Sequence, residues 1–152
     1  MAISKFVRGL TAASLMGASL VGASMFGVSP ASATASLGGS WSSSAPSDAT
    51  GVSAKKEKDF GKYTLQLRYG RYGGQGWIWA RITGIETDLS AYIVSLKVTE
   101  RATGKTASSW KAVNGKRTTY TNAYRYRSNH VFQACYKHNN LGGTPVCISH
   151  TT

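Results

Sequence analysis

Arginine and aromatic residues alternate in two stretches of the sequence, and these residue types suit the binding of an anionic ligand. One stretch, residues 67–81, reads LRYGRYGGQGWIWAR, and the other, residues 124–127, reads YRYR. A guanidinium binds phosphate or carboxylate through two parallel hydrogen bonds, and flat rings stack on bases or sugars. The candidate residues for binding a polyanion are Arg68, Arg71, Arg81, Arg125, Arg127, Tyr69, Tyr72, Trp77, Trp79, Tyr124 and Tyr126.

A structural interpretation of the same residues competes with binding. In small β domains, Trp and Tyr usually pack in the core or across strands. On a strand at 124–127, the two arginines would share one face and the two tyrosines the other. Residues 77–82 are apolar on both faces, so one face could be a platform for a ligand rather than core.

Three histidines are the candidate groups for catalysis. Two imidazoles and a cation could cleave RNA by proton transfer and phosphate stabilisation. His130 and His138 are separated by an even number of residues on one expected strand, so they share a face. At ~3.3 Å per residue they would lie about 26 Å apart, too far for one phosphate unless His150 supplies the second imidazole. A secreted ribonuclease is therefore an alternative to binding.

Other catalytic patterns are missing from the sequence. Glu86 and Asp88 lie in a loop-like stretch, where solvated carboxylates are common. No G-x-S-x-G elbow, phosphate-binding loop or dinucleotide fingerprint occurs, and the histidines lack the close spacing of a zinc finger. We expect no catalytic residue, no cofactor and no metal site.

The charge distribution points to an anionic partner. The chain of 152 residues has 18 Lys and Arg against 6 Asp and Glu, a formal charge of +12. Residues 60–152 hold 13 of these bases and only three acids. A folded domain with this excess is destabilised by its own repulsion, so we expect a polyanion such as a cell-wall polymer, an acidic polysaccharide or extracellular nucleic acid.

The N-terminus has the features of a Sec signal peptide. Lys5 and Arg8 precede an uncharged, mostly apolar run, and an A-x-A tripeptide ends at Ala33. We expect cleavage after Ala33, or alternatively after Ala35, so that residues 1–33 are removed. A retained membrane anchor is the competing interpretation, but glycines and serines interrupt the run and no basic cluster follows. The mature protein is then secreted, extracellular or associated with the cell wall.

The exported chain divides into a leader and one domain. Residues 34–59 are rich in Ser, Gly and Ala and predict a flexible leader, in which Trp41 either docks on the domain or, as is more common, is an exposed aromatic. Residues 60–152 form the basic β domain, because apolar residues recur there with a period of two. We expect strands at 63–69, 77–82, 92–98, 106–113, 116–121, 131–138 and 145–149, and residues 124–127 either extend the strand at 116–121 or form another short strand.

This strand pattern predicts an all-β fold, a small antiparallel sandwich or barrel of about seven strands. A glycine-rich connection covers residues 70–76, and Asn114-Gly115 predicts a type I′ hairpin. Cys135 and Cys147, the two cysteines of the chain, predict one disulfide between the last two strands, across the loop at 139–144. A loop of this length corresponds to roughly 3 kcal/mol of stabilisation.

The residues Leu67-Arg68-Tyr69, followed by Trp77-Ile78-Trp79-Ala80-Arg81, resemble the L-R-Y and W-A-R signature of a family of small secreted bacterial β-proteins of unknown function, common in high-GC Gram-positives. That family usually has a cysteine soon after L-R-Y, where this chain has Tyr72 and Gly73. The resemblance implies export and a β-fold, and no particular activity.

The leading hypothesis is a secreted, non-catalytic protein that binds a polyanion through a basic aromatic β-surface. A first alternative is a small secreted hydrolase inhibitor or a bacteriocin-like antagonist, acting through the disulfide-braced loop at 139–144. The ribonuclease is the second alternative.

Overall fold

A computed structural model describes residues 37–85, 92–138 and 144–152. These residues all belong to one compact unit, Ser32–Thr152. The predicted signal peptide (1–33), the carboxylates Glu86 and Asp88, and nearly all of the loop at 139–144 lie outside the described residues. No helix among the described residues is both long and apolar enough to cross a membrane.

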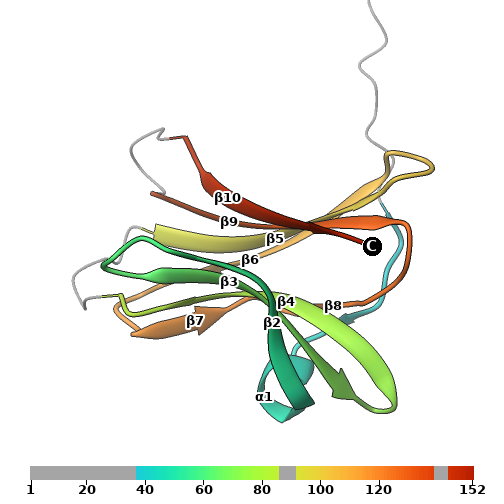
Figure 1. Cartoon of the computed structure of the whole chain (residues 1–152), viewed down its shortest axis with the longest axis horizontal. Helices are drawn as coiled ribbons and strands as arrows, with labels where there is room; N and C mark the ends of the chain where they lie inside the picture. The colour runs from blue at the N-terminus through green and yellow to red at the C-terminus, as the bar shows by residue number, and fades with distance from the viewer. Residues whose placement is uncertain (1–36, 86–91, 139–143) are drawn as a thin grey trace, which may run out of the picture. The chain divides into compact units, whose positions relative to one another are not determined.

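Two antiparallel sheets form the fold and confirm the predicted all-β architecture (Figure 1). The larger sheet contains, in spatial order, β1 (Trp41–Ser42), β8 (Ala123–Arg125), β4 (Gln75–Thr83), β3 (Thr64–Tyr72) and β2 (Thr50–Asp59), with β7 (Thr118–Tyr120) also paired to β4. The smaller sheet contains β10 (Val146–Thr151), β9 (His130–His138), β5 (Tyr92–Glu100) and β6 (Thr106–Ala112). The described strands exceed the expected number, because β1 and β2 form in the segment that was expected to be a leader.

Apolar side chains at alternate strand positions fill the space between the two sheets. Leu65 and Leu67 on β3 are fully buried, whereas Gln66 between them is only half-buried. Val94 and Leu96 on β5 face them from the smaller sheet and belong to the same core cluster. Burial of each such side chain stabilises the fold by about 1.5–3 kcal/mol. Because two separate sheets enclose this core, the fold is a sandwich and not a closed barrel.

Residues 41–59, which the sequence predicted as part of a flexible leader, form β1, α1 (Ala45–Asp48) and β2. Every residue of β2 is exposed, although the strand pairs with β3 along its length. An edge strand with no buried face shows no alternation of apolar and polar residues, which is why the pattern missed it. The ring of Trp41 packs edge-on against Tyr124 at 4.9 Å and is not an isolated exposed aromatic.

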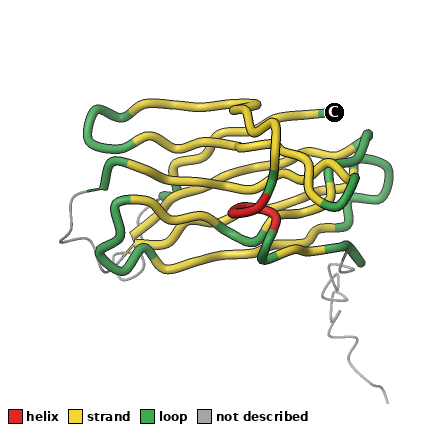
Figure 2. The backbone as a smooth tube through the Cα atoms, turned by 90° about the horizontal axis from the view of Figure 1, so that it is seen from below, coloured by secondary structure: helices red, strands yellow, loops and turns green. Residues whose placement is uncertain are grey.

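The short helix α1 covers part of the outer face of the larger sheet. Ala45 is fully buried and forms a small apolar cluster with Trp79 and Ala123. Figure 2, turned so that this side faces the reader, shows the helix in front of the strands. The segment that was expected to be a flexible leader therefore buries Trp79, which would otherwise be exposed on this face.

The turn at Asn114-Gly115 does not form the predicted hairpin. Both residues have positive φ, 43° and 67°, and the Lys116 amide donates to the Val113 carbonyl at 3.0 Å. The tight turn is therefore present, but β6 before it pairs with β5, whereas β7 after it pairs with β4. The chain crosses here from the smaller sheet to the larger one, because β6 and β7 find their partners in different layers.

The β3–β4 hairpin turns at Gly73 and Gly74, whose φ values are 56° and 73°. Two positive φ values in a two-residue turn match the twist of the flanking strands, and glycine adopts them without strain. The predicted connection at 70–76 is therefore only two residues long, since β3 continues to Tyr72 and β4 begins at Gln75.

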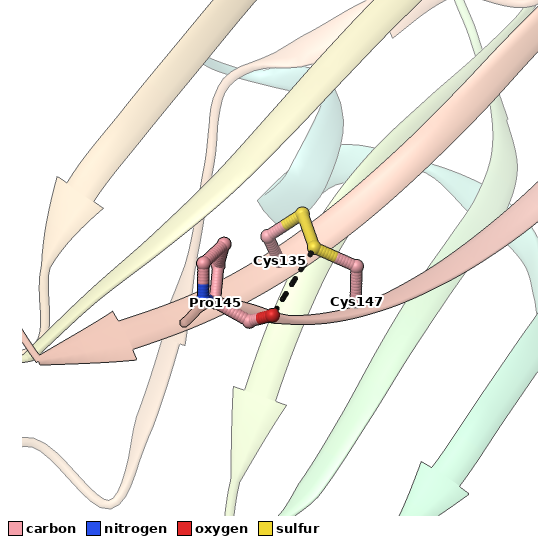
Figure 3. Close-up of a disulfide and its surroundings, with 3 residues drawn as sticks. All are labelled: Cys135, Pro145 and Cys147. Carbon is pink, nitrogen blue, oxygen red and sulfur yellow. Dashed lines mark hydrogen bonds between the residues drawn. A yellow bond between two sulfur atoms is a disulfide. The ribbon is translucent and has the colours of Figure 1, made fainter. Parts of the chain in front are cut away.

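A disulfide joins Cys135 on β9 to Cys147 on β10, as the sequence predicted (Figure 3). The two cysteines are direct partners across the strands, with Cα atoms 4.1 Å apart. Their neighbours Ala134 and Ile148 point into the core. Because side chains alternate along a strand, the disulfide lies on the outer face of the smaller sheet.

Candidate anion-binding site

Two of the predicted arginines meet on the outer face of the larger sheet. Arg68 on β3 is the cross-strand partner of Trp79, and Arg81 on β4 is the partner of both Gln66 and Tyr120. These side chains alternate with the core residues of the same strands, so they project away from the core. The register therefore makes Arg68 and Arg81 diagonal neighbours, within reach of one another for long side chains.

A hollow of about 270 Å³ lies between these arginines. Trp79 is only 2% exposed, so it contributes a rigid wall with little free surface, whereas Tyr120 is 39% exposed. Residues from α1, β2, β3, β4 and β7 line the hollow, namely Pro46, Val52, Arg68, Trp79, Arg81, Thr118 and Tyr120.

The electrostatics of the hollow favour an anion. Burial lowers the pKa of Arg68 from its usual value, the charge of Arg81 lowers it further, and Glu57 acts in the opposite direction. The guanidinium nevertheless stays charged at any ordinary pH. Its Nε is buried and has no hydrogen-bond partner among the described residues. An anion between the two arginines would offset their repulsion.

Glu57, an acid whose charge acts on Arg68, is already engaged in a hydrogen bond. Its carboxylate accepts a hydrogen bond from the Gln66 amide at 3.0 Å, across the β2–β3 pairing. This acid moderates the positive field at Arg68 without entering the lining of the hollow.

A second group of predicted residues lies on the same face, toward the β3–β4 hairpin. Arg125 is the cross-strand partner of Trp77 and donates a hydrogen bond to the Gln75 side chain. The Trp77 indole donates to the Tyr72 carbonyl at 2.9 Å, and the Tyr72 ring is 37% exposed. The outer face of the larger sheet thus carries Arg68, Arg81 and Arg125, together with half-buried and exposed rings.

Three predicted tyrosines point the other way, into the sandwich. Tyr124 is fully buried. Tyr126 packs edge-on against Tyr69 at 5.0 Å and stacks on Phe132 at 5.5 Å. Tyr124 and Trp79 are therefore buried by packing, whereas Tyr69 and Tyr126 are half-buried and pack against neighbouring rings.

The remaining predicted arginines are exposed but separate from the hollow. Arg71 alternates with Tyr72 on β3 and so lies on the opposite side of the hairpin. Arg127 follows the end of β8, and its carbonyl accepts a hydrogen bond from the Thr152 hydroxyl at 2.8 Å. Neither residue lines the hollow between Arg68 and Arg81.

The described imidazoles are engaged within the sandwich. His130 is 5% exposed, and its Nδ1 donates to the Ser128 carbonyl at 2.7 Å. His150 shares a hydrogen bond of 3.0 Å with the Tyr126 hydroxyl, and burial and then the charges of Lys55 and Lys56 lower its pKa. The side chain of His138 lies outside the described part of the chain. Among the described residues, no group of three His, Cys, Asp or Glu could hold a metal ion.

No protein-family model, curated protein or solved structure matches this chain. The resemblance of residues 67–81 to a secreted β-protein family therefore stays a prediction.

Sequence reasoning missed Pro46, Val52, Thr118 and Tyr120 in the lining of the hollow. Pro46 and Val52 fell in the expected leader, and Thr118 and Tyr120 fell on a strand expected to form a hairpin with residues 106–113. Their contribution depends on β7 pairing with β4 and on β2 pairing with β3. Tyr120 lies on a strand that the sequence did predict, so its aromatic ring was the available signal.

Proposed function

We propose that this protein is a secreted, non-catalytic binding protein for an anionic polymer, and that the outer face of its larger sheet is the binding surface. The observation that carries the proposal is the convergence of Arg68 and Arg81 on one hollow beside the exposed ring of Tyr120. Two guanidiniums that repel each other are an unfavourable arrangement unless an anion binds between them.

Each part of the face has a role in this proposal. Arg68 and Arg81 bind one phosphate or carboxylate group through forked hydrogen bonds. Tyr120 offers a ring against which the adjoining sugar or base packs. Arg125 lies near Trp77, which is four residues from Arg81 along β4, or roughly 13 Å at ~3.3 Å per residue. A second anionic group of the same polymer would bind there.

The two alternatives have weaker support. The inhibitor hypothesis depends on the loop at 139–144, which lies almost entirely outside the described residues. The ribonuclease hypothesis depends on imidazoles, and both that are described are held inside the sandwich by packing and hydrogen bonds. Both hypotheses stay predictions.

The experiment compares two charge-matched double variants of the mature protein on immobilised polyanions. Arg68→Gln/Arg81→Gln removes the pair in the hollow, and Arg101→Gln/Lys105→Gln removes two exposed bases near the β5–β6 turn. We expect the first variant to bind about 10- to 100-fold more weakly than the second, because it loses two forked contacts. The salt dependence of binding should also become shallower.

The immobilised polymers separate the sources of the anion. A polyphosphodiester such as teichoic acid or single-stranded DNA presents phosphates, and a polyuronate presents carboxylates. Loss of binding to either class in the hollow variant, relative to its control, supports the proposal and identifies the anion. Equal elution of both variants from every polymer would refute it.

A further inference from the structure

The outer face of the smaller sheet carries a second hollow, on different strands from the first. Its volume is about 450 Å³, and the lining includes Ser95, Lys97, Trp110, Gln133, Cys135 and Lys137. These residues come from β5, β6 and β9, so none of them belongs to the larger sheet. Of these residues, only Cys135 was predicted from the sequence to have a role, as half of the disulfide.

Trp110 is the most unusual residue of this hollow. Its side chain is 64% exposed, more than any other large hydrophobic side chain among the described residues. An indole left in water gives up the stabilisation that burial of so large a ring provides. Surface tryptophans of this kind commonly mark binding sites, because the ring is rigid and loses little entropy on contact.

The strand register places polar groups around this indole. Trp110 lies opposite Ser95, and Ser95 lies opposite Cys135, so one row crosses from the ring to the disulfide. In the next row Lys97 lies between Ser108 and Gln133. The rigid floor of paired strands and disulfide holds these side chains in fixed positions.

Both charges on this face are positive. Lys97 and Lys137 project outward from β5 and β9, where the partner of Lys137 is Ile93. The outward positions of the four described strands of this sheet contain no Asp or Glu. Lys137 lies on the neighbouring strand, four residues along β9 from Gln133, the partner of Lys97, so the two lysine Cα atoms are about 14 Å apart. The row that contains Trp110, Ser95 and Cys135 runs between them.

We propose that this hollow binds an acidic polysaccharide, with one sugar ring stacked on Trp110. The C–H face of a pyranose packs against the indole, while serine hydroxyls and the Gln133 amide exchange hydrogen bonds with its hydroxyl groups. Lys97 and Lys137 pair with carboxylates of the neighbouring sugars. A flexible, hydrated ammonium suits such solvent-exposed charge pairing.

The lining favours a sugar over nucleic acid. Proteins that bind single strands stack successive bases on several rings, whereas Trp110 is the one aromatic residue among the described lining residues. Hydroxyl and amide groups instead surround it. A neutral glycan would leave the two lysines without a role, which is why we assign an acidic one.

The test is a titration of the mature protein with oligogalacturonate, followed by intrinsic tryptophan fluorescence and calorimetry. Trp110→Ala should weaken binding at least tenfold, and Lys97→Gln/Lys137→Gln should weaken it and flatten its salt dependence. Because Trp110 is exposed, its variant should keep the melting temperature of the native protein. Neutral dextran should not bind measurably.

Several outcomes would overturn the inference: undiminished binding by Trp110→Ala, equal binding of dextran, or a dependence on Trp110 seen only with a DNA oligonucleotide. Arg101→Gln/Lys105→Gln, which removes two exposed bases that line neither hollow, serves as the charge-matched control and should bind oligogalacturonate unchanged. The two proposals therefore fail separately, since one depends on the arginine pair and the other on Trp110 and the lysine pair.

Discussion

Arg68 on β3 and Arg81 on β4 are diagonal neighbours that line the same hollow. Burial lowers the pKa of Arg68, and the positive charge of Arg81 lowers it further. The pair is therefore a source of repulsion in the folded protein that an anion would remove.

Arg81→Gln should leave the stability of the ligand-free protein unchanged or slightly raise it, because it removes a like charge beside Arg68. Phosphate or sulfate at millimolar concentration should raise the melting temperature of the native protein by binding the folded state, and this rise should shrink in the variant. Thermal unfolding measures both effects. Arg101→Gln, which removes an exposed base elsewhere, should keep the full response to the anion.

Ala45→Glu should destabilise the protein by about 1–3 kcal/mol or more, because the larger, charged side chain must enter a packed site. Ala45 is fully buried against Trp79 and Ala123. Urea unfolding gives the free energy. Ser47→Glu, an exposed change in the same short helix, should have little effect. Equal stability of both variants would show that the helix does not pack on the sheet in solution.

Tyr124→Phe should leave stability unchanged or raise it. The Tyr124 hydroxyl is buried with no hydrogen-bond partner among the described residues, so its removal avoids a desolvation cost. Tyr126→Phe is the matched change, and it should cost about 1 kcal/mol because the hydroxyl shares a hydrogen bond with His150. If Tyr124→Phe is the more damaging of the two, the Tyr124 hydroxyl has a partner in solution.

The stability of the protein should fall as the pH drops below about 6.5. Burial, followed by the charges of Lys55 and Lys56, lowers the pKa of His150 in the folded state from 6.5. The unfolded chain then binds a proton that the folded protein does not bind, so acid favours unfolding. The loss begins near the unfolded pKa and is complete below the lowered folded pKa.

His150→Gln should flatten this pH dependence, as measured by urea unfolding between pH 7.5 and 5. Lys55→Gln/Lys56→Gln should reduce it without abolishing it, because burial is the larger cause of the shift. An unaltered pH profile in His150→Gln would assign the acid sensitivity to another group.

Much of the fold could be predicted from local patterns in the sequence. Alternation of apolar residues on β3 and β5 identified two of the strands that enclose the core, because each has one buried face, whereas β4 was visible as a run that is apolar on both faces. Cysteine count and spacing predicted the Cys135–Cys147 pair. The arginine and aromatic stretches were equally visible as residue types suited to anions, but their orientation was not.

The tertiary structure decided which of those residues reach a ligand. Arg68 and Arg81 share a hollow only because β3 and β4 pair in one register, and Tyr120 joins them only because the chain changes sheets after Asn114-Gly115. A period of two predicts that side chains alternate between faces, and it carries no information about which distant segment covers a face. Helix α1 covers Trp79, whereas no segment of the described chain buries Trp110. Which of the two tryptophans is covered depends on contacts between parts of the chain that are far apart in sequence.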